Sequence, residues 1–242
     1  MKRVDLKAGA LTAPIPPAIV TVGEGDKANM LTVAWTGILA TVPPRTYISV
    51  RPSRHSHGLL LEYGEFVINL PTVELAKKVD YVGIYTGAKV DKFEKCGLTK
   101  MKSKIVGAPT VGECPVALEC RVVDRIPMGS HDVFVADILS VSVREELVDR
   151  EGKLHFELAD LLAYAHGEYY ALGERVGRFG FSTDKEKKAR PVSREEKTSG
   201  TKEMTSGEKK APKEERKKPF YEGLSASVRR KNGSKGRSKK SK

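Results

Sequence analysis

A cluster of hydroxyl and basic side chains lies where a predicted strand gives way to a predicted helix. The β-branched segment TYISVRP, residues 46–52, is followed directly by Ser53, Arg54, His55 and Ser56. A helix N-terminus offers unpaired N–H groups and a partial positive charge, and an arginine adds a planar fork of donors. The junction therefore suits a phosphate group. The alternative is that Ser53 only caps the helix while the arginines are solvated.

Histidines supply two further patterns. His131 stands at the head of a long predicted strand in GSHDVF, where it can face a cleft, although a lone histidine is more often structural. His55 and His57 are the alternative candidates for a metal pair. Two-residue spacing on a helix points their rings in different directions, and no third ligand of matching character lies nearby. We predict no metal site.

Several motifs that would supply chemistry directly are absent from the sequence. It contains no GxGxxG, no GxxxxGK[ST] and no GxSxG, so neither a dinucleotide fold, a P-loop nor a nucleophile elbow is supported. Cys96, Cys114 and Cys120 show no CxxC spacing, and we expect buried reduced thiols. A domain without its own nucleophile favours chemistry carried by a bound cofactor.

Strands dominate the elements that must position these residues. Segments rich in β-branched residues and bounded by Gly or Pro recur at short intervals, which is typical of strands. The predicted strands are 17–23, 29–35, 46–52, 65–71, 116–126 and 131–147, and the predicted helices are 53–64, 72–83 and 89–97. The last strand exceeds the usual length, as strands that curl around a barrel do. The fold class is therefore mainly β, with a closed or half-open sheet.

The two long predicted strands alternate apolar and polar residues. In the first, Glu119 and Arg121 fall on the face opposite Cys120. In the second, one face carries Val133, Val135, Leu139, Val141 and Val143, interrupted by Asp137. Because side chains alternate across a strand, the pattern predicts an apolar face and a polar face for each.

Charge is distributed unevenly along the chain. Residues 1–180 carry 22 basic and 22 acidic side chains, whereas residues 181–242 carry 21 and 9. The apolar side chains between Lys185 and Pro219 are too few to offset the cost of ordering them. We therefore predict one domain over residues 1–182 and a disordered Lys/Arg-rich tail over 183–242. Such a tail can bind nucleic acid or an acidic protein surface weakly, bind a protein partner, dock its PFYEGL segment back on the barrel, or do nothing specific.

The N-terminal segment has no apolar run of signal-peptide length, and no segment reaches the length of a membrane span. We expect a soluble, cytoplasmic protein with no membrane contact.

Seven segments taken together resemble the flavin reductase-like family of FMN-binding split barrels, most closely its flavoredoxin-type branch. The resemblance spans about residues 10–182 and rests on their order along the chain. The segments are NMLTVAW, PPRTYISVRPSRHS, FVINLP, DYVGIYTG with VDKFEKCGLT, APTVGECPVALECRVVD, GSHDVFVADI and EYYALGERVG. The resemblance implies a split β-barrel with a few short helices, and a homodimer with FMN in a groove near the subunit interface.

The resemblance also implies a role for individual residues. Asn29, Met30 and Thr32 would lie along the isoalloxazine ring, and His131 would sit by its face, where a nicotinamide could stack. Residues at the end of the predicted strand 46–52 and at the junction after it would surround the ribityl phosphate. They are Ser49, Val50, Arg51, Ser53 and Ser56. Asn69 and Lys92 are further implied contacts.

The chain departs from the family pattern at three places. Residues 86–89 read TGAK, where the family often has serine, glycine and arginine. His57 stands where an aromatic residue is common, and Ala136 and Asp137 replace a usual Gly and Glu. The first and third departures touch the cofactor or interface region, which leaves the preference between NADH and NADPH open.

The leading functional hypothesis is an oxidoreductase that passes electrons from NADH or NADPH through FMN to a flavin, metal or protein acceptor. The alternatives are an electron-transfer protein with tightly held FMN, and a polyanion-binding protein acting through its tail.

Overall fold

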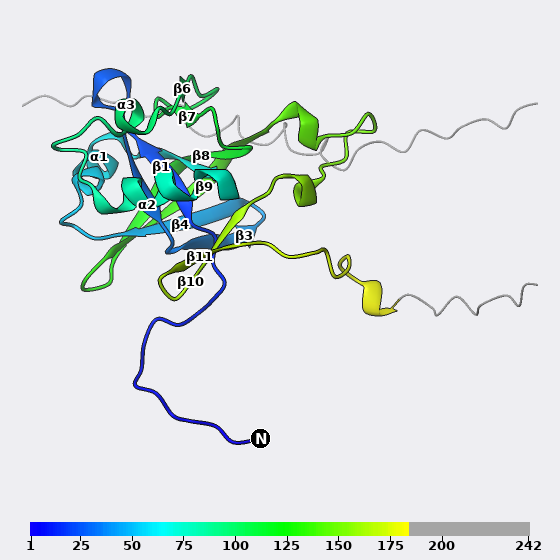
Figure 1. Ribbon diagram of the computed structural model, residues 1–242. Coiled ribbons are helices and arrows are strands. Elements are labelled where there is room, and N and C mark those ends of the chain that lie inside the picture. Colours follow the sequence, from blue (N-terminus) through cyan, green and yellow to red (C-terminus); the bar gives the residue numbers. More distant parts are fainter. Residues whose placement is uncertain (184–242) are drawn as a thin grey trace, which may run out of the picture. The chain divides into compact units, whose positions relative to one another are not determined.

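The computed structural model of the chain describes residues 1–183. The predicted disordered tail lies outside the described residues from Asp184 onward. The elements are β1 (Ala18–Val22), β2 (Asn29–Val33), β3 (Thr36–Thr41), β4 (Pro44–Val50), α1 (His55–Tyr63), β5 (Glu65–Leu70), α2 (Ala76–Ile84), α3 (Lys92–Cys96), β6 (Lys100–Met101), β7 (Thr110–Val111), β8 (Val116–Pro127), β9 (Asp132–Val143), β10 (Leu162–Ala165) and β11 (Glu168–Ala171) (Figure 1). The predicted mainly β class is confirmed.

The main sheet of residues 1–183 has seven antiparallel strands in the order β2-β1-β5-β8-β9-β4-β3. Its two edge strands, β2 and β3, follow one another in the sequence with only Ala34 and Trp35 between them. The sheet must therefore curl until its edges meet. Ser49 of β4 completes this seam by donating its backbone N–H to the Trp35 carbonyl at 2.9 Å. The result is a split barrel.

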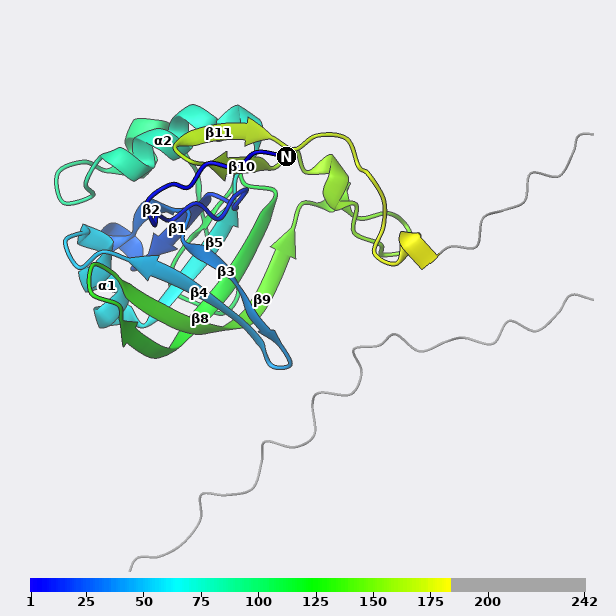
Figure 2. The same ribbon diagram turned by 90° about the horizontal axis from the view of Figure 1, so that it is seen from below.

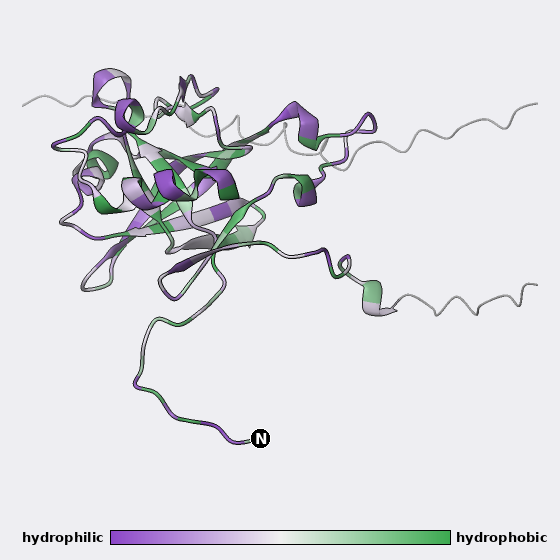
Figure 3. Ribbon diagram, in the orientation of Figure 1, coloured by the Kyte–Doolittle hydropathy of each residue, from purple (hydrophilic) through white to green (hydrophobic). Residues whose placement is uncertain are grey.

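Two hydrophobic cores explain why β1 is buried at every position. Ala18, Val20 and Val22 point into the barrel, whereas Ile19 points outward into a second core. The second core contains Met30, Leu75, Val79, Val82, Phe93, Leu98, Val111, Cys114 and Leu162. Helices α2 and α3 and the β10–β11 hairpin thus cover the outer face of β1 and β2 (Figure 2). Figure 3 shows hydrophobic residues along parts of the central sheet and hydrophilic residues on several of the surrounding loops.

The junction between β4 and α1 does not contain the helix cap that the sequence offered as the alternative to a phosphate site. Arg54 is the N-cap residue of α1, and no side chain caps the helix. The alternative role of Ser53 as a helix cap is therefore wrong. In the first turn of α1 the His57 N–H donates to the Arg54 carbonyl at 2.9 Å, and the Arg54 side chain makes no capping bond. At its other end the helix stops at Gly64, which adopts φ 63°, a left-handed conformation that glycine accepts readily.

The predicted faces of the two long strands need correction. In the first half of β9 the residues buried in the barrel are Phe134 and Ala136, while Val133 and Val135 are half-buried. The strand ends at Val143, the last residue of the predicted alternation, and a short 3₁₀ turn, Glu145–Leu147, follows it. The valine-rich face of β9 is not the face that lines the barrel core. It carries valines because other segments partly cover the outer surface of the sheet.

Glu119 is the clearest exception to the expected polar outer face of β8. Its side chain is buried, and its carboxylate accepts the backbone N–H groups of Lys104, Ile105 and Val106 at 2.9, 2.6 and 3.1 Å. A register shift in the β8–β9 ladder falls directly after it, between Glu119 and Cys120. Glu119 therefore anchors the segment that passes over the outer face of the sheet.

Candidate functional site

A groove runs along β2, where two adjoining cavities share the lining residues Leu31, Arg51 and Arg54. The first cavity has a volume of about 230 Å³ and lies between β2, the start of α1 and the segment before α3. The second has a volume of about 440 Å³ and lies between β2, the end of β4 and the start of β9. The groove therefore opens at the split between the first edge strand and β4.

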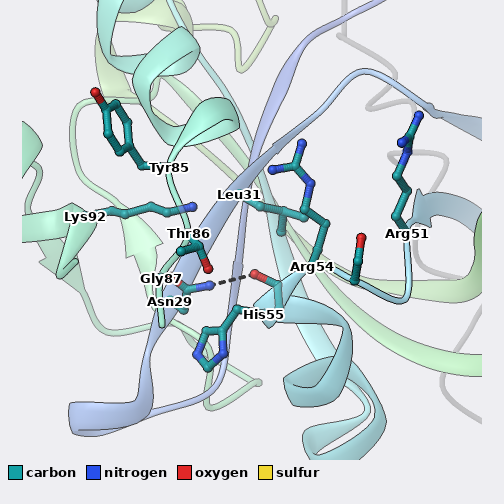
Figure 4. Close-up of a pocket in the computed structure, with 11 residues that line it drawn as sticks. Asn29, Leu31, Arg51, Arg54, His55, Tyr85, Thr86, Gly87 and Lys92 are labelled. Carbon is teal, nitrogen blue, oxygen red and sulfur yellow. Dashed lines mark hydrogen bonds between the residues drawn. The ribbon is translucent and has the colours of Figure 1, made fainter. Parts of the chain in front are cut away.

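The first cavity is positively charged. Arg51, Arg54 and Lys92 line it, and no carboxylate is among its lining residues. Lys92 and Arg54 extend into it from opposite sides, with Leu31 between them (Figure 4). Ser53 and Ser56 add hydroxyl groups from the junction. Cations and hydroxyls at a helix N-terminus suit an anion with several oxygen atoms, such as a phosphate.

Lys92 carries the strongest argument for an anionic ligand. It is the first residue of α3, only 4 % exposed, and its Nζ donates to the carbonyls of Met30 at 2.7 Å and Val82 at 2.8 Å. Burial, and secondly the nearby Arg54 guanidinium, lower the pKa of Lys92 to about 8. Two carbonyls orient the ammonium group without neutralising its charge. An anion in this cavity would supply that neutralisation.

Asn29 lies at the floor of the first cavity, where Gly87 packs directly against it. The Asn29 Nδ2 donates to Ser56 Oγ at 2.6 Å, which ties β2 to the first turn of α1 (Figure 4). A Cβ atom on Gly87 would lie 2.0 Å from Asn29 Oδ1. Only glycine fits at this position without moving the Asn29 amide.

The second cavity is less charged and more apolar. Its walls include Val33, Trp35, Val50 and Tyr164, with Thr32, Ser49 and His131 among its polar groups. The Thr32 hydroxyl donates to the Val79 carbonyl of α2, so its remaining hydrogen-bonding capacity is as an acceptor. Apolar walls with a few placed polar groups are typical of a site for a flat organic ligand.

His131 occupies the wall of the second cavity, as the sequence suggested for a residue at the head of β9. Ser130 Oγ lies 2.9 Å from its Nδ1. Burial, and secondly the charge of Arg51, lower the pKa of His131 below 6.5. The lowered pKa favours the neutral form of the ring, and within residues 1–183 its Nε2 makes no hydrogen bond.

The structure brings most of the predicted site residues together in this groove. Those that line it are Asn29, Thr32, Ser49, Val50, Arg51, Ser53, Ser56, Lys92 and His131. Met30 and Asn69 line neither cavity. The Met30 side chain lies in the second core, and its carbonyl accepts from Lys92. Asn69 is fully buried, bonded to the Ile19 carbonyl and the Val111 N–H at 2.9 Å each, so we assign it to holding the sheet together.

Sequence reasoning missed several groove residues. Tyr164 comes from the β10–β11 hairpin, and no local pattern links that hairpin to β2. Tyr85, Thr86 and Gly87 follow α2 and reach the first cavity through a turn. The sequence marked residues 86–89 only as a departure from a family pattern, and the glycine was the available signal for close packing.

Neither a metal centre nor a membrane-spanning helix is found in the described part of the chain. No group of three or more His, Cys, Asp or Glu side chains gathers within residues 1–183 in a way that could hold a metal ion. In the same residues, no helix is both long and apolar enough to cross a membrane.

Comparisons with known proteins agree with this arrangement. The family model described as "Flavin reductase like domain" matches residues 11–173. The chain is similar to flavoredoxin of Desulfovibrio vulgaris (Miyazaki F), with a TM-score of 0.71 and 31 % identity over 75 % of this chain and 100 % of that one. The chain is also similar to flavoredoxin from Methanosarcina acetivorans, with a TM-score of 0.70 and 25 % identity over 76 % of this chain and 98 % of that one. An uncharacterized protein of Archaeoglobus fulgidus is 38 % identical over 54 % of this chain and 75 % of its own length.

Proposed function

The chain belongs to the flavin reductase-like family, and on that premise we propose that its groove holds FMN and passes electrons through it. The observation that carries the proposal is the continuity of the two cavities. A cationic, carboxylate-free cavity suits a phosphate, and the more apolar cavity next to it suits a flat ring system. FMN has both parts, joined by a ribityl chain.

Different residues of the groove would contact different parts of FMN. Arg51, Arg54 and Lys92 would neutralise the phosphate, and Ser53 and Ser56 would add hydrogen bonds to it. Trp35 and Tyr164 would enclose the ring system and exclude water from it. Bound FMN would supply reversible two-electron chemistry toward a nicotinamide. His131, whose lowered pKa favours the neutral ring, would position a donor or handle a proton at Nε2.

The proposed donor is NADH or NADPH, and the acceptor is a flavin, a metal or a protein. An electron-transfer role with tightly held FMN is the second candidate, favoured by the similarity to two flavoredoxins. Steady-state oxidation of NAD(P)H separates the two roles, because only the reductase turns over with nicotinamide. The first experiment is the visible spectrum of the protein after addition of FMN and desalting, followed by anaerobic NADH or NADPH. Retained bands that bleach support the reductase, retained bands that do not bleach support the carrier, and no retained or titratable flavin contradicts both.

A homodimer is part of the proposal. The edge strand β3 and the turn after it expose Ile38, Leu39 and Val42, whose exposed fractions are 65 %, 53 % and 83 %. Trp35, which lines the second cavity, directly precedes this strand. A second copy covering β3 would bury this apolar edge next to the groove. Light scattering should give twice the chain mass, and Ile38→Lys should lower it; a monomeric wild type would contradict this part of the proposal.

Affinity for FMN should fall as the pH rises above about 8. Free Lys92 loses its proton through that range, whereas a bound phosphate dianion favours the protonated form. Binding then takes up a proton, and affinity falls by at most about tenfold per pH unit. Fluorescence titrations of FMN between about pH 7 and 9.5 would measure this slope. Lys92→Met should abolish it, since arginines do not titrate there; an equal slope in that variant would contradict the assignment.

The substitution Gly87→Ala should weaken FMN binding, by about tenfold. The new methyl group would collide with the Asn29 amide and break its bond to Ser56 at the first cavity. Gly58→Ala is the matched control, because its Cβ would meet nothing within 4 Å. Isothermal titration with FMN compares the two variants. Equal affinities would show that the Asn29–Ser56 contact has no part in binding.

A further inference from the structure

Asp132 contacts the two residues that flank one short segment, residues 51–56, which spans the end of β4 to the first residues of α1 and which we call the anion-binding loop. In the ladder between β4 and β9, Asp132 lies opposite Val50, the residue from which the loop departs. At the other end, Oδ2 of Asp132 lies 2.9 Å from Nε2 of His57, the residue that follows the loop. One residue of β9 therefore holds both the start and the end of the loop.

The contact between His57 and Asp132 is sheltered from water. Their side chains are 9 % and 10 % exposed. The His57 ring packs edge-on against Phe134, with 5.4 Å between ring centroids. Arg125 Nη1 approaches Asp132 Oδ2 from the other side at 3.4 Å. A hydrogen bond in such surroundings is stronger than the same bond at the surface, and it restrains both partners.

Asp132 is also the immediate neighbour of His131 in the sequence. His131 and the loop residue Arg51 both line the second cavity, and Arg51 and Arg54 are the charged side chains that share it with His131. The distance between the loop and His131 thus depends on how β9 and the first turn of α1 are joined. Two side-chain contacts link them directly, the His57–Asp132 hydrogen bond and the packing of the His57 ring on Phe134.

We propose that His57 and Asp132 form a positioning pair that fixes the anion-binding loop against β9 and so sets the spacing between the phosphate end of the groove and His131. The proposal rests on the proposed function for its effect on FMN, but its geometric part concerns the protein without ligand. Neither residue lines the two cavities, so both act through their neighbours.

Three variants separate positioning from simple packing. His57→Phe keeps a ring against Phe134 but removes the bond to Asp132. His57→Gln restores an N–H donor near the place of Nε2. His155→Phe is the matched control, because His155 Nε2 makes a similar contact with Asp149 Oδ2 at 2.8 Å without either residue lining the groove.

Two readouts are measured on each variant. The first is the dissociation constant of FMN, which should rise on the order of tenfold in His57→Phe, recover partly in His57→Gln and stay unchanged in His155→Phe. The second is the NMR titration of His131 in protein without flavin. Loosening the loop moves the Arg51 charge away, so the pKa of His131 should rise in His57→Phe, but not in His155→Phe.

The outcomes distinguish the two proposals. If the wild type binds no FMN, the proposed function fails, and the His131 titration alone still decides the positioning role. If FMN binds and His57→Phe changes neither readout, the pair only packs and the inference is overturned. Should His57→Phe not fold, Asp132→Asn carries the FMN readout, since it keeps the side-chain size and the ladder; an unchanged dissociation constant there also overturns the inference.

Discussion

FMN should bind Lys92→Met about 10–100-fold more weakly than it binds the wild type, the range expected for a lost hydrogen bond to a charged group. Methionine keeps an unbranched apolar side chain that is one atom shorter. It removes the buried ammonium, which the Met30 and Val82 carbonyls hold at the wall of the cationic cavity. Isothermal titration at pH 7 measures the loss directly.

Lys89→Met is the control for this result. Lys89 precedes the same helix, is exposed, and does not line the cationic cavity. The substitution Lys89→Met removes one positive charge from the same region of the protein, so the general electrostatic attraction of FMN falls equally in both variants. Affinity in Lys89→Met should stay within about twofold of the wild type, since exposed charges are screened by salt. Equal losses in the two variants would mean that Lys92 acts only through overall charge.

The largest effect on stability is expected for Glu119→Ala, roughly 3 kcal/mol of unfolding free energy. The substitution leaves three backbone N–H groups of residues 104–106 without their acceptor. Urea denaturation followed by circular dichroism measures the change. FMN affinity should be preserved, because residues 104–106 line neither cavity.

Glu113→Ala gives the comparison for Glu119. The Glu113 carboxylate accepts from the Thr99 backbone N–H and hydroxyl, but its surroundings are more exposed. Water replaces such bonds readily, so we expect a loss of roughly 1 kcal/mol. A loss in Glu119→Ala no greater than in Glu113→Ala would show that the segment over the sheet does not depend on its buried anchor.

Local patterns predicted six of the seven strands of the main sheet, all but β3, and the strand-to-helix junction that follows β4. Both depend on neighbouring residues: a β-branched run ending at Val50, then hydroxyl and basic side chains at the start of a helix. The position of Lys92 came from a family resemblance, because nothing in VDKFEK indicates a buried ammonium group. Its burial arises only when α3 packs on β2 and α2.

Other features depend on contacts between distant segments. The alternation of apolar and polar residues predicted which residues of β8 share a face of the strand. It did not predict that residues 104–106 cover Glu119. Asn69 carries an amide of the kind that binds ligands, yet the same amide joins β5 to β1 and β7. The sequence of a single strand does not distinguish these roles, since both require a polar side chain on a strand.

The seam at Trp35 has a consequence for how the chain folds. Because β2 and β3 are adjacent in sequence, the seam contact between Ser49 and Trp35 is local, whereas the barrel closes only through pairings of distant segments such as β4 with β9 and β5 with β8. Closure should thus be among the last and slowest events, as non-local strand pairing generally is. Trp35 is the single tryptophan of the chain and also lines the second cavity. Its fluorescence therefore offers one optical signal for two events, the closing of the barrel and the arrival of a ligand beside it.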